Sequence, residues 1–125
     1  MVVLSARICK DKYKQLHWDF IEETCRSFNA KVLSKDDIEL PIPNIGVIAL
    51  NHATGDYMQD LDLSEVHTVL VGCDDDRDDD WMAPYRQVRI SSPVNYYLWS
   101  GVALGIFLHH LHISSLDKGI GYEDS

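Results

Sequence analysis

The chain has 125 residues, a formal net charge of −9 at pH 7 and a 46% share of hydrophobic residues. This length suits one domain with a sizeable core, and the acidic balance counts against RNA or DNA binding by a single subunit, because nucleic-acid binders usually present a basic face. No apolar stretch is long enough to span a membrane, and the N-terminus has no signal-peptide pattern. Three irregularly spaced cysteines, Cys9, Cys25 and Cys73, indicate reduced thiols and a cytoplasmic protein.

Apolar runs alternate with helical patterns along the chain, which predicts an α/β domain built on a parallel sheet. The first helix is expected over 10–28, with Asp11 as its N-cap and Asn29 in the left-handed conformation that often ends a helix. Short β-type runs mark the expected strands at 2–8, 30–33, 46–50, 67–71 and 87–90. Residues 1–115 are predicted to form a single domain, and residues 116–125 a flexible tail.

The two expected helices differ in their patterns. Apolar or small residues recur at helical spacing on the first helix and predict one buried face: Tyr13, Leu16, His17, Phe20, Ile21, Thr24, Cys25 and Phe28. The most hydrophobic segment, 98–111, predicts a second, buried helix, in which Gly101 and Gly105 lie one turn apart and let another element approach closely. The proline-containing stretch 34–44 is expected to be a connection, and a short helix is possible around 57–61.

Ligands of open parallel sheets bind at the carboxyl ends of the strands, so a small-molecule site is expected within 66–112, where two strands and their loops lead into the last helix. Six aspartates fall within 74–80, and closely spaced carboxylates can hold calcium or magnesium. An EF-hand, however, needs glycine and glutamate where Asp79 and Tyr85 stand, so a solvated loop is favoured. A group of histidines, His109, His110 and His112, has no cysteine or carboxylate to complete a ligand set. No metal site is predicted.

Other polar and aromatic groups leave alternatives open. Residues 17–19, His-Trp-Asp, could place a base near a substrate hydroxyl, although packing and surface roles are favoured for residues of an amphipathic helix. Tyr96, Tyr97 and Trp99 could stack on a base, fill a pocket, or pack in the core or a dimer interface. Cys73 lies beside many carboxylates, which disfavour a thiolate, so it is not proposed as a nucleophile.

Several segments of the chain resemble one known family. The stretch HWDFIEETCRSFNA at 17–30 is similar to the pattern N-x-G-A-I-I-R-T-A-x-x-F-G-A. Residues 47–51 and 70–75 are similar to V-A-L-E and L-V-x-G-x-E-G, and residues 90–92 with 97–106 resemble I-P-M…S-L-N-V-S-V-A-A-G-I. These patterns are typical of the SPOUT class of RNA methyltransferases, specifically the SpoU-like ribose 2′-O-methyltransferase branch, and the resemblance covers most of the chain.

The chain departs from this family at polar positions. His17 stands where the family has an asparagine, and Glu23 replaces the arginine that the family associates with catalysis. Asp74 replaces the glutamate of the G-x-E loop, and Trp99 and Tyr97 stand at the asparagine and serine of S-L-N. The apolar skeleton therefore matches, whereas the polar signature is largely absent.

The resemblance implies a parallel-sheet SPOUT fold with a C-terminal trefoil knot, normally a homodimer, that binds S-adenosylmethionine in the knot largely through backbone groups of three loops. The residues expected to bind this cofactor are Leu50, Asn51, Gly72, Asp74, Ile90, Ser92, Tyr97 and Leu98. His17 and Glu23 are the candidate catalytic residues, because ribose methylation requires removal of the hydroxyl proton.

The leading hypothesis is an RNA methyltransferase dependent on S-adenosylmethionine, acting on a ribose 2′-hydroxyl of tRNA or rRNA, with neither DNA nor a membrane as partner. Basic residues would have to attract the RNA: Arg7, Lys10, Lys12, Arg26 and Arg89. A second subunit could combine two weak basic patches. The alternative is a catalytically inactive knotted dimer acting as a binding or regulatory module, which the substitutions at His17, Glu23 and Trp99 motivate. Its acidic surface would favour a basic protein partner over RNA. A third interpretation is a small nucleotide-binding α/β protein without a knot.

Overall fold

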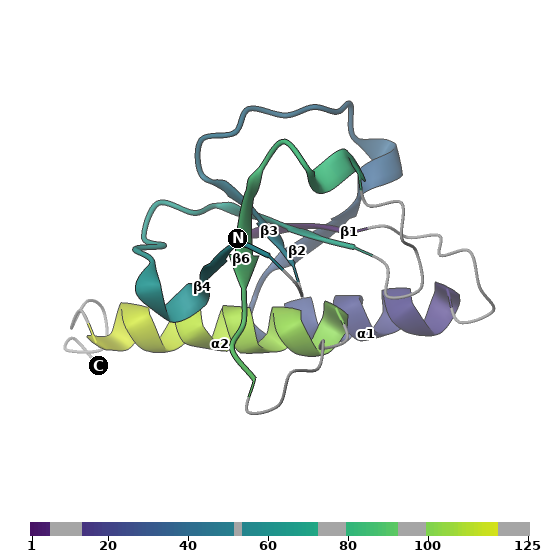
Figure 1. The fold of residues 1–125 in the computed structure, drawn as a ribbon. Helices are drawn as coiled ribbons and strands as arrows, with labels where there is room; N and C mark the ends of the chain where they lie inside the picture. Colours follow the sequence, from purple (N-terminus) through teal and green to yellow (C-terminus); the bar gives the residue numbers. More distant parts are fainter. Residues whose placement is uncertain (6–13, 52–53, 73–79, 93–99, 118–125) are drawn as a thin grey trace.

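The computed structural model describes residues 1–5, 14–51, 54–72, 80–92 and 100–117 (Figure 1). The helices and strands, in chain order, are β1 (Val2–Ser5), α1 (Lys14–Ser27), β2 (Lys31–Ser34), β3 (Val47–Leu50), β4 (Asp56–Tyr57), β5 (Thr68–Val71), β6 (Arg86–Arg89) and α2 (Ser100–Asp117). Short 3₁₀ helices cover Lys35–Asp37, Met58–Asp60 and Asp80–Met82. Within these ranges, no helix is long and apolar enough to cross a membrane.

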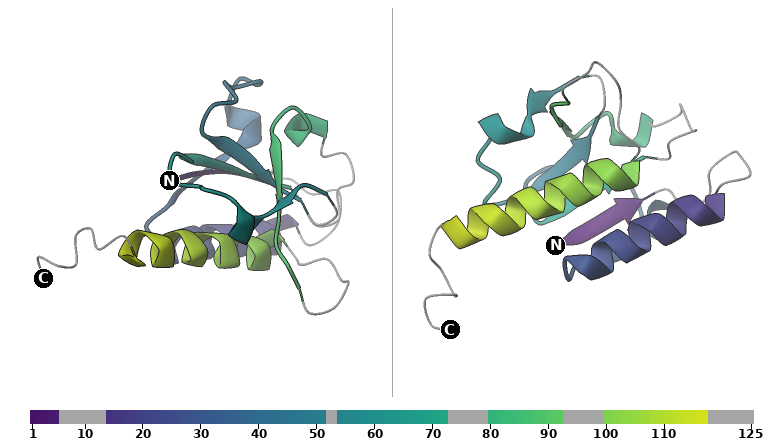
Figure 2. Two further views of the ribbon diagram at one scale, coloured as in Figure 1. Left: turned by 60° about the vertical axis from the view of Figure 1, so that its left-hand side comes forward. Right: turned by 90° about the horizontal axis from the view of Figure 1, so that it is seen from below.

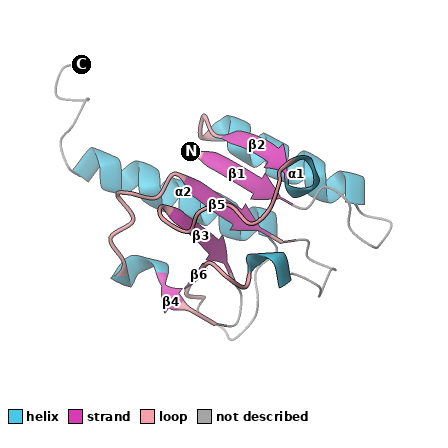
Figure 3. Cartoon of the chain, turned by 90° about the horizontal axis from the view of Figure 1, so that it is seen from above, coloured by secondary structure: helices cyan, strands magenta, loops and turns pink. Residues whose placement is uncertain are grey.

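The strands form one parallel sheet in the order β2-β1-β5-β3-β6-β4 (Figure 3). The predicted parallel α/β sheet is thereby confirmed. Strand β2 lies on one side of β1, whereas β5, β3, β6 and β4 all lie on the other side. Since every strand is parallel to its neighbours, all carboxyl ends meet at the same edge, where ligands of open α/β sheets bind.

Side chains of the central strands alternate between the two faces of the sheet, as the pleat of a strand requires. One hydrophobic cluster, on the face that the helices cover, contains Val3, Ile48, Val69, Val71 and Val88. A second cluster, on the opposite face, contains Leu4, Val47, Ala49 and Leu70. Because both faces are apolar, β3 and β5 are buried at every position, which explains why their sequences are continuous apolar runs.

Both helices cover the same face of the sheet and run side by side (Figures 1 and 2). They bury Trp18, Ile21 and Cys25 from α1 and Leu104, Phe107 and Leu108 from α2. After α1, Asn29 has a φ of 55°, so the predicted left-handed turn is confirmed. This reversal directs the chain into β2, whose register pairs Lys31 with Val2 of β1.

Connecting segments and short 3₁₀ helices, in place of α-helices, cover the opposite face. Its cluster includes Met82 and Tyr85, with Ile38, Ile42 and Trp81 packed against it. The Tyr85 hydroxyl accepts a hydrogen bond from the Ile42 N–H (2.8 Å) and donates one to the Ile42 carbonyl (3.0 Å). These two bonds tie the connection between β2 and β3 to the turn that precedes β6.

The predicted burial of the two helices was wrong in part. Leu16 and Phe20 of α1 are 66% and 43% exposed, and α2 exposes Val102 (40%), Ile106 (39%) and Ile113 (40%). The α2 sequence is apolar all round, so its pattern could not show which side faces the sheet. An apolar strip from both helices therefore lies on the surface.

Element boundaries differ from the prediction in a few places. α2 runs to Asp117, past the predicted end at residue 111, and so includes the first two residues of the predicted tail. The strand β4 was missed, because Asp56 and Tyr57 are both exposed and carry no apolar pattern. The other ends of strands agree within one residue, except that residues 6–8 of the first predicted strand lie outside the described residues. Asp11, the predicted N-cap, lies outside the described residues.

The first turn of α2 packs directly against α1 through Gly101. A Cβ atom at this position would lie 2.9 Å from Cδ1 and 3.0 Å from Cγ of Phe20. At Gly105 the nearest atom would be Cγ2 of Thr24 at 3.7 Å, which is ordinary van der Waals contact. The predicted close approach is thus confirmed at Gly101, whereas Gly105 leaves room for a methyl group.

These two glycines should respond differently to alanine. Gly105→Ala is expected to raise the free energy of unfolding by up to about 1 kcal/mol, because alanine is the better helix former. Gly101→Ala should lower it by about 1 kcal/mol, because the methyl group displaces the Phe20 ring. Urea unfolding followed by circular dichroism measures both changes. Equal stabilisation by the two substitutions would contradict the packing of Phe20 on Gly101.

Candidate functional site

Three neighbouring strands, β5, β3 and β6, end side by side at the carboxyl edge of the sheet. Leu50 ends β3 and pairs in register with Val88 of β6. The N–H of Asn51 then donates to the Val88 carbonyl (2.9 Å), which extends the pairing by one residue. Gly72 follows β5 and Ile90 follows β6, so the chain leaves the sheet at three adjacent points.

This edge contains the described part of the predicted cofactor site. Those residues are Leu50, Asn51, Gly72, Ile90 and Ser92, whereas Asp74, Tyr97 and Leu98 lie outside the described residues. The side chain of Leu50 belongs to the cluster under the helices, and that of Ile90 packs against it. A ligand at this edge would therefore meet Leu50 and Ile90 through their backbone groups.

A network of side-chain amides, not predicted from the sequence, links this edge to the turn before β6. Gln87 Nε2 donates to the carbonyls of Met82 (2.9 Å) and Tyr85 (2.8 Å). Its Oε1 accepts from Asn51 Nδ2 (2.9 Å), and Asn51 Oδ1 accepts from the Thr54 N–H (3.1 Å). The Gln87 carboxamide therefore connects the chain that follows β3 to the turn that precedes β6.

The network fixes the orientation of both amides. Two carbonyl oxygens can only accept, so the Gln87 nitrogen must face them and its oxygen must face Asn51. This places the Asn51 oxygen toward the Thr54 N–H. A polar side chain in an internal strand such as β6 normally has hydrogen-bond partners, and this rule was the one signal in the sequence that could have pointed to Gln87.

Gly55 brings the chain after β3 into direct contact with the same residue. Its φ is +105°, and a Cβ there would lie 2.3 Å from the Gln87 carbonyl oxygen. A side chain at this position would clash with the backbone of β6 and would also require a conformation that L residues rarely adopt. Glycine is therefore needed for the chain to cross β6 closely before it forms β4.

Two cation contacts hold β4 against β6 beyond the site. The Arg89 guanidinium lies over the Tyr57 ring, 4.2 Å from its centroid, and Arg86 forms an ion pair with Asp56 (3.0 Å). Tyr57 and Arg89 are register partners. Of the five basic residues predicted to attract RNA, Arg7, Lys10 and Lys12 lie outside the described residues. Of the other two, Arg26 lies on α1 and Arg89 lies at the carboxyl end of β6.

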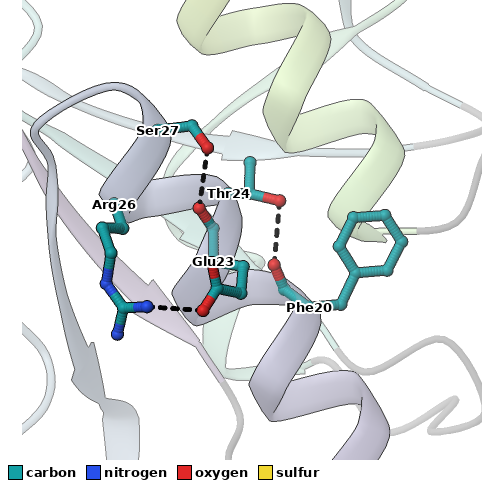
Figure 4. Close-up of polar contacts among 5 residues, drawn as sticks. All are labelled: Phe20, Glu23, Thr24, Arg26 and Ser27. Carbon is teal, nitrogen blue, oxygen red and sulfur yellow. Dashed lines mark hydrogen bonds and ion pairs between the residues drawn. The ribbon is translucent and has the colours of Figure 1, made fainter.

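The two predicted catalytic residues lie on different sides of α1. His17 is partly buried in the first turn, at the end of α1 that lies toward the carboxyl edge of β1 (Figure 2). Glu23 lies about 9 Å further along the axis and about 120° around it. Its carboxylate accepts a hydrogen bond from Arg26, and both side chains are about two-thirds exposed (Figure 4). Of the two, His17 lies nearer the strand ends.

Hydroxyls of α1 are bound to the helix itself. Thr24 donates to the Phe20 carbonyl (2.8 Å) and Ser27 donates to the Glu23 carbonyl (3.0 Å) (Figure 4).

Within the part of the chain that the structure describes, no group of three His, Cys, Asp or Glu side chains could hold a metal ion. His109 packs edge-on against Phe28 instead, with ring centroids 6.3 Å apart. Residues 74–79 of the acidic run 74–80 lie outside the described residues.

Cys25 should be chemically inert in the folded protein. It is 1% exposed, and burial, with a smaller effect of Glu22, raises the thiol pKa from 9.0 to about 11. Since the thiolate is the reactive form, iodoacetamide at pH 8 should leave Cys25 unmodified until denaturant is added. Mass spectrometry of the cysteine peptides measures this, and rapid labelling of the native protein would contradict the burial.

The raised pKa of Cys25 also makes the stability of the fold depend on pH. Because the folded-state pKa of Cys25 is the higher one, its contribution to stability is fully present below pH 9 and is lost as the pH rises toward 11. Unfolding of wild type and of Cys25→Ala, compared at pH 8 and pH 10.5, isolates this contribution, because the variant cannot titrate at this position.

The sheet and its two helices define an α/β protein. Neither a family model nor a curated protein sequence matches the chain. A solved structure is similar over 89% of this chain and 87% of its own length, with a TM-score of 0.63 and 13% sequence identity. It is described under the heading "Structural insights into the 2-OH methylation of C/U34 on tRNA". At this identity, the similarity demonstrates a shared fold.

Proposed function

We propose that the protein is an RNA methyltransferase that transfers a methyl group from S-adenosylmethionine to a ribose 2′-hydroxyl of tRNA or rRNA in the cytoplasm. The observation that carries this proposal is the shared fold with a structure studied for 2-OH methylation of tRNA, over nearly nine-tenths of both chains. The apolar pattern that the chain shares with the SpoU-like branch supports the same fold, whereas the polar residues of that branch are largely replaced.

The strand ends suit the methyl donor. Adenine and ribose carry hydrogen-bonding groups that backbone N–H and C=O groups can satisfy, and Asn51, Gly72 and Ile90 follow three adjacent strands. Gly72 is buried, and the absence of a Cβ lets a backbone approach a ligand closely. Asp74, Ser92, Tyr97, Leu98 and Leu50 are proposed to complete the site. The bound donor supplies an activated methyl group, and these residues hold it in place.

The proposal includes a single knotted domain. In the proposed knot, the chain after β6 would pass through the loop that follows β5 before it forms α2. The order β5-β3-β6 in the sheet and the return of α2 across the helix-covered face are compatible with this path (Figure 1). An experimental structure in which α2 does not thread this loop would favour the unknotted nucleotide-binding interpretation.

A homodimer is proposed through the exposed apolar strip of α1 and α2. Val102, Ile106 and Ile113 share one face of α2 by helical spacing, and Leu16 and Phe20 lie one turn apart on α1. Phe20 reaches Gly101 of α2, so the two rows adjoin. Monomers rarely expose contiguous apolar patches of this kind, whereas a symmetric dimer would bury the same strip on both copies.

His17 is the preferred proton acceptor in this proposal. The ribose hydroxyl must lose a proton as it accepts the methyl group, and an imidazole can take it near neutral pH. Much of the rate would come from holding the donor and the hydroxyl together. Glu23 is the second candidate. Arg26 and Arg89 of each subunit, with Arg7, Lys10 and Lys12, would attract RNA to a surface built from two subunits.

Calorimetric titration with S-adenosylmethionine and its demethylated product tests the proposal first. Micromolar binding is expected, followed by incorporation of labelled methyl groups into tRNA or rRNA. Gly72→Val should abolish both, because its side chain would occupy the donor site. Absence of heat at several temperatures and high protein concentration would exclude the donor site.

The alternative is a knotted dimer that binds a partner without methyl transfer. It is motivated by Glu23, which stands at the position of the family arginine and is bound to Arg26 on an exposed face, and by the net charge of −9. Such a protein would dimerise but would incorporate no methyl groups, and a basic partner would bind it more strongly at low salt than at high salt.

A further inference from the structure

We propose that Gln87 is a positioning residue for the methyl-donor site: its carboxamide sets the chain that leaves β3 against the turn that enters β6. The inference rests on the proposed function, because it concerns that same site. Gln87 lies on β6 and was not among the residues expected to bind the donor. Its role follows from the two segments that its side chain and backbone contact, the turn before β6 and the chain after β3.

The carboxamide joins two segments that are far apart in sequence. Toward β6, its Nε2 donates hydrogen bonds to the carbonyls of Met82 and Tyr85. Both residues belong to the turn between the end of the acidic run and β6. Toward β3, its Oε1 accepts a hydrogen bond from Asn51 Nδ2, and Asn51 Oδ1 in turn accepts one from the Thr54 N–H.

The backbone of Gln87 is used as well. Gly55 crosses over the Gln87 carbonyl so closely that a Cβ would lie 2.3 Å from its oxygen. The position of Thr54 and Gly55 is therefore set twice, by the amide network and by packing on β6. Because Asn51 supplies one of the three strand ends of the proposed donor site, a change at Gln87 should move that strand end without removing any group that touches the donor.

Gln87→Glu tests this with minimal change of shape. The carboxylate can still accept from Asn51, but it cannot donate to the two carbonyls. Tyr85→Phe is the matched control, because it removes two hydrogen bonds from the same turn, to Ile42, on the side away from Asn51. Gln87→Met serves as a second variant if Gln87→Glu does not fold. Thermal melts establish that each protein is folded at the temperature of the titration.

Calorimetry with the demethylated product should give at least about tenfold weaker binding for Gln87→Glu, as expected from the loss of buried hydrogen bonds, and less than about threefold for Tyr85→Phe. Hydrogen exchange at the Thr54 amide should accelerate in the Gln87 variants but not in Tyr85→Phe. Unchanged affinity in the Gln87 variants, or an equal loss in Tyr85→Phe, overturns the inference while the proposed function stands.

A wild-type protein that binds no donor or product overturns both the inference and the proposed function.

The unaltered protein offers a measurement that requires no variant. The side-chain NH₂ resonances of Gln87 and Asn51 should shift when the demethylated product is added, because the network borders the site. Resonances that stay unchanged at saturation show that the network is separate from the site, and overturn the inference.

Discussion

Ile106→Glu should convert the proposed homodimer into a monomer. Ile106 lies in the middle of the exposed apolar strip, between Val102 and Ile113, and its side chain is 39% exposed in the single chain. In a symmetric interface the substitution would bury an uncompensated carboxylate twice. A cost of about 3 kcal/mol or more corresponds to dimerisation weakened at least about a hundredfold.

Sedimentation velocity over a range of protein concentrations measures this change. Ile45→Glu is the matched control, because Ile45 is the most exposed large apolar residue in the described part of the chain, at 87%, and belongs to the turn before β3 and not to the apolar strip of the helices. That variant should remain as dimeric as wild type. An Ile106→Glu protein that stays dimeric would place the interface elsewhere, and a monomeric wild type would remove the dimer from the proposal.

Several strands could be predicted because their sequences meet a strict physical requirement. β3 and β5 are buried on both faces, and a parallel strand of that kind must be a continuous apolar run. β4 has only two residues, both exposed, so nothing in its side chains distinguishes it from a loop. Its pairing depends on β6, with Arg89 over Tyr57, and this is a tertiary contact that a local pattern does not contain.

The helices show where a hydrophobic pattern loses information. In α2 the buried Leu104 and Phe107 alternate with the exposed Val102 and Ile106, although all four are apolar. A helix that is apolar all round is predicted to be buried, and the sequence does not reveal whether the sheet or a second copy covers each side. In the structure of the single chain, Leu104 and Phe107 lie on the side of α2 that faces the sheet, whereas Val102 and Ile106 lie on the exposed side, which we propose as the dimer interface.

The candidate site was predicted only in part. The sequence predicted that strands and their loops within 66–112 would form a site, and the parallel topology brings the ends of β3, β5 and β6 to one edge. The roles of Asn51, Gly72 and Ile90 at that edge came from the resemblance and stay predictions. The amide network of Gln87 could not be predicted, because it requires the turn at Met82 and Tyr85 to fold back over β6. Catalytic roles for His17 and Glu23 came from the resemblance alone and stay predictions.

Phe107→Ala should have the largest effect on the stability of the fold. Phe107 is fully buried in the cluster that joins both helices to the sheet. Removing the ring should lower the free energy of unfolding by about 3–5 kcal/mol, since both the transfer energy and the energy of the cavity are lost. This is a large part of the roughly 5–15 kcal/mol that stabilises a typical domain.

The neighbouring Ile106 provides the comparison that separates core from interface. Urea unfolding followed by tryptophan fluorescence, with Trp18 buried as a reporter, should show a loss for Phe107→Ala that does not depend on protein concentration. The loss for Ile106→Ala should instead depend on concentration, because dimerisation contributes to apparent stability by mass action. If Phe107→Ala cost less than about 1 kcal/mol, its ring would not occupy the core as described. If both losses varied with concentration alike, the two faces of α2 would not be distinct, and the division between sheet-facing and dimer-facing residues would be wrong.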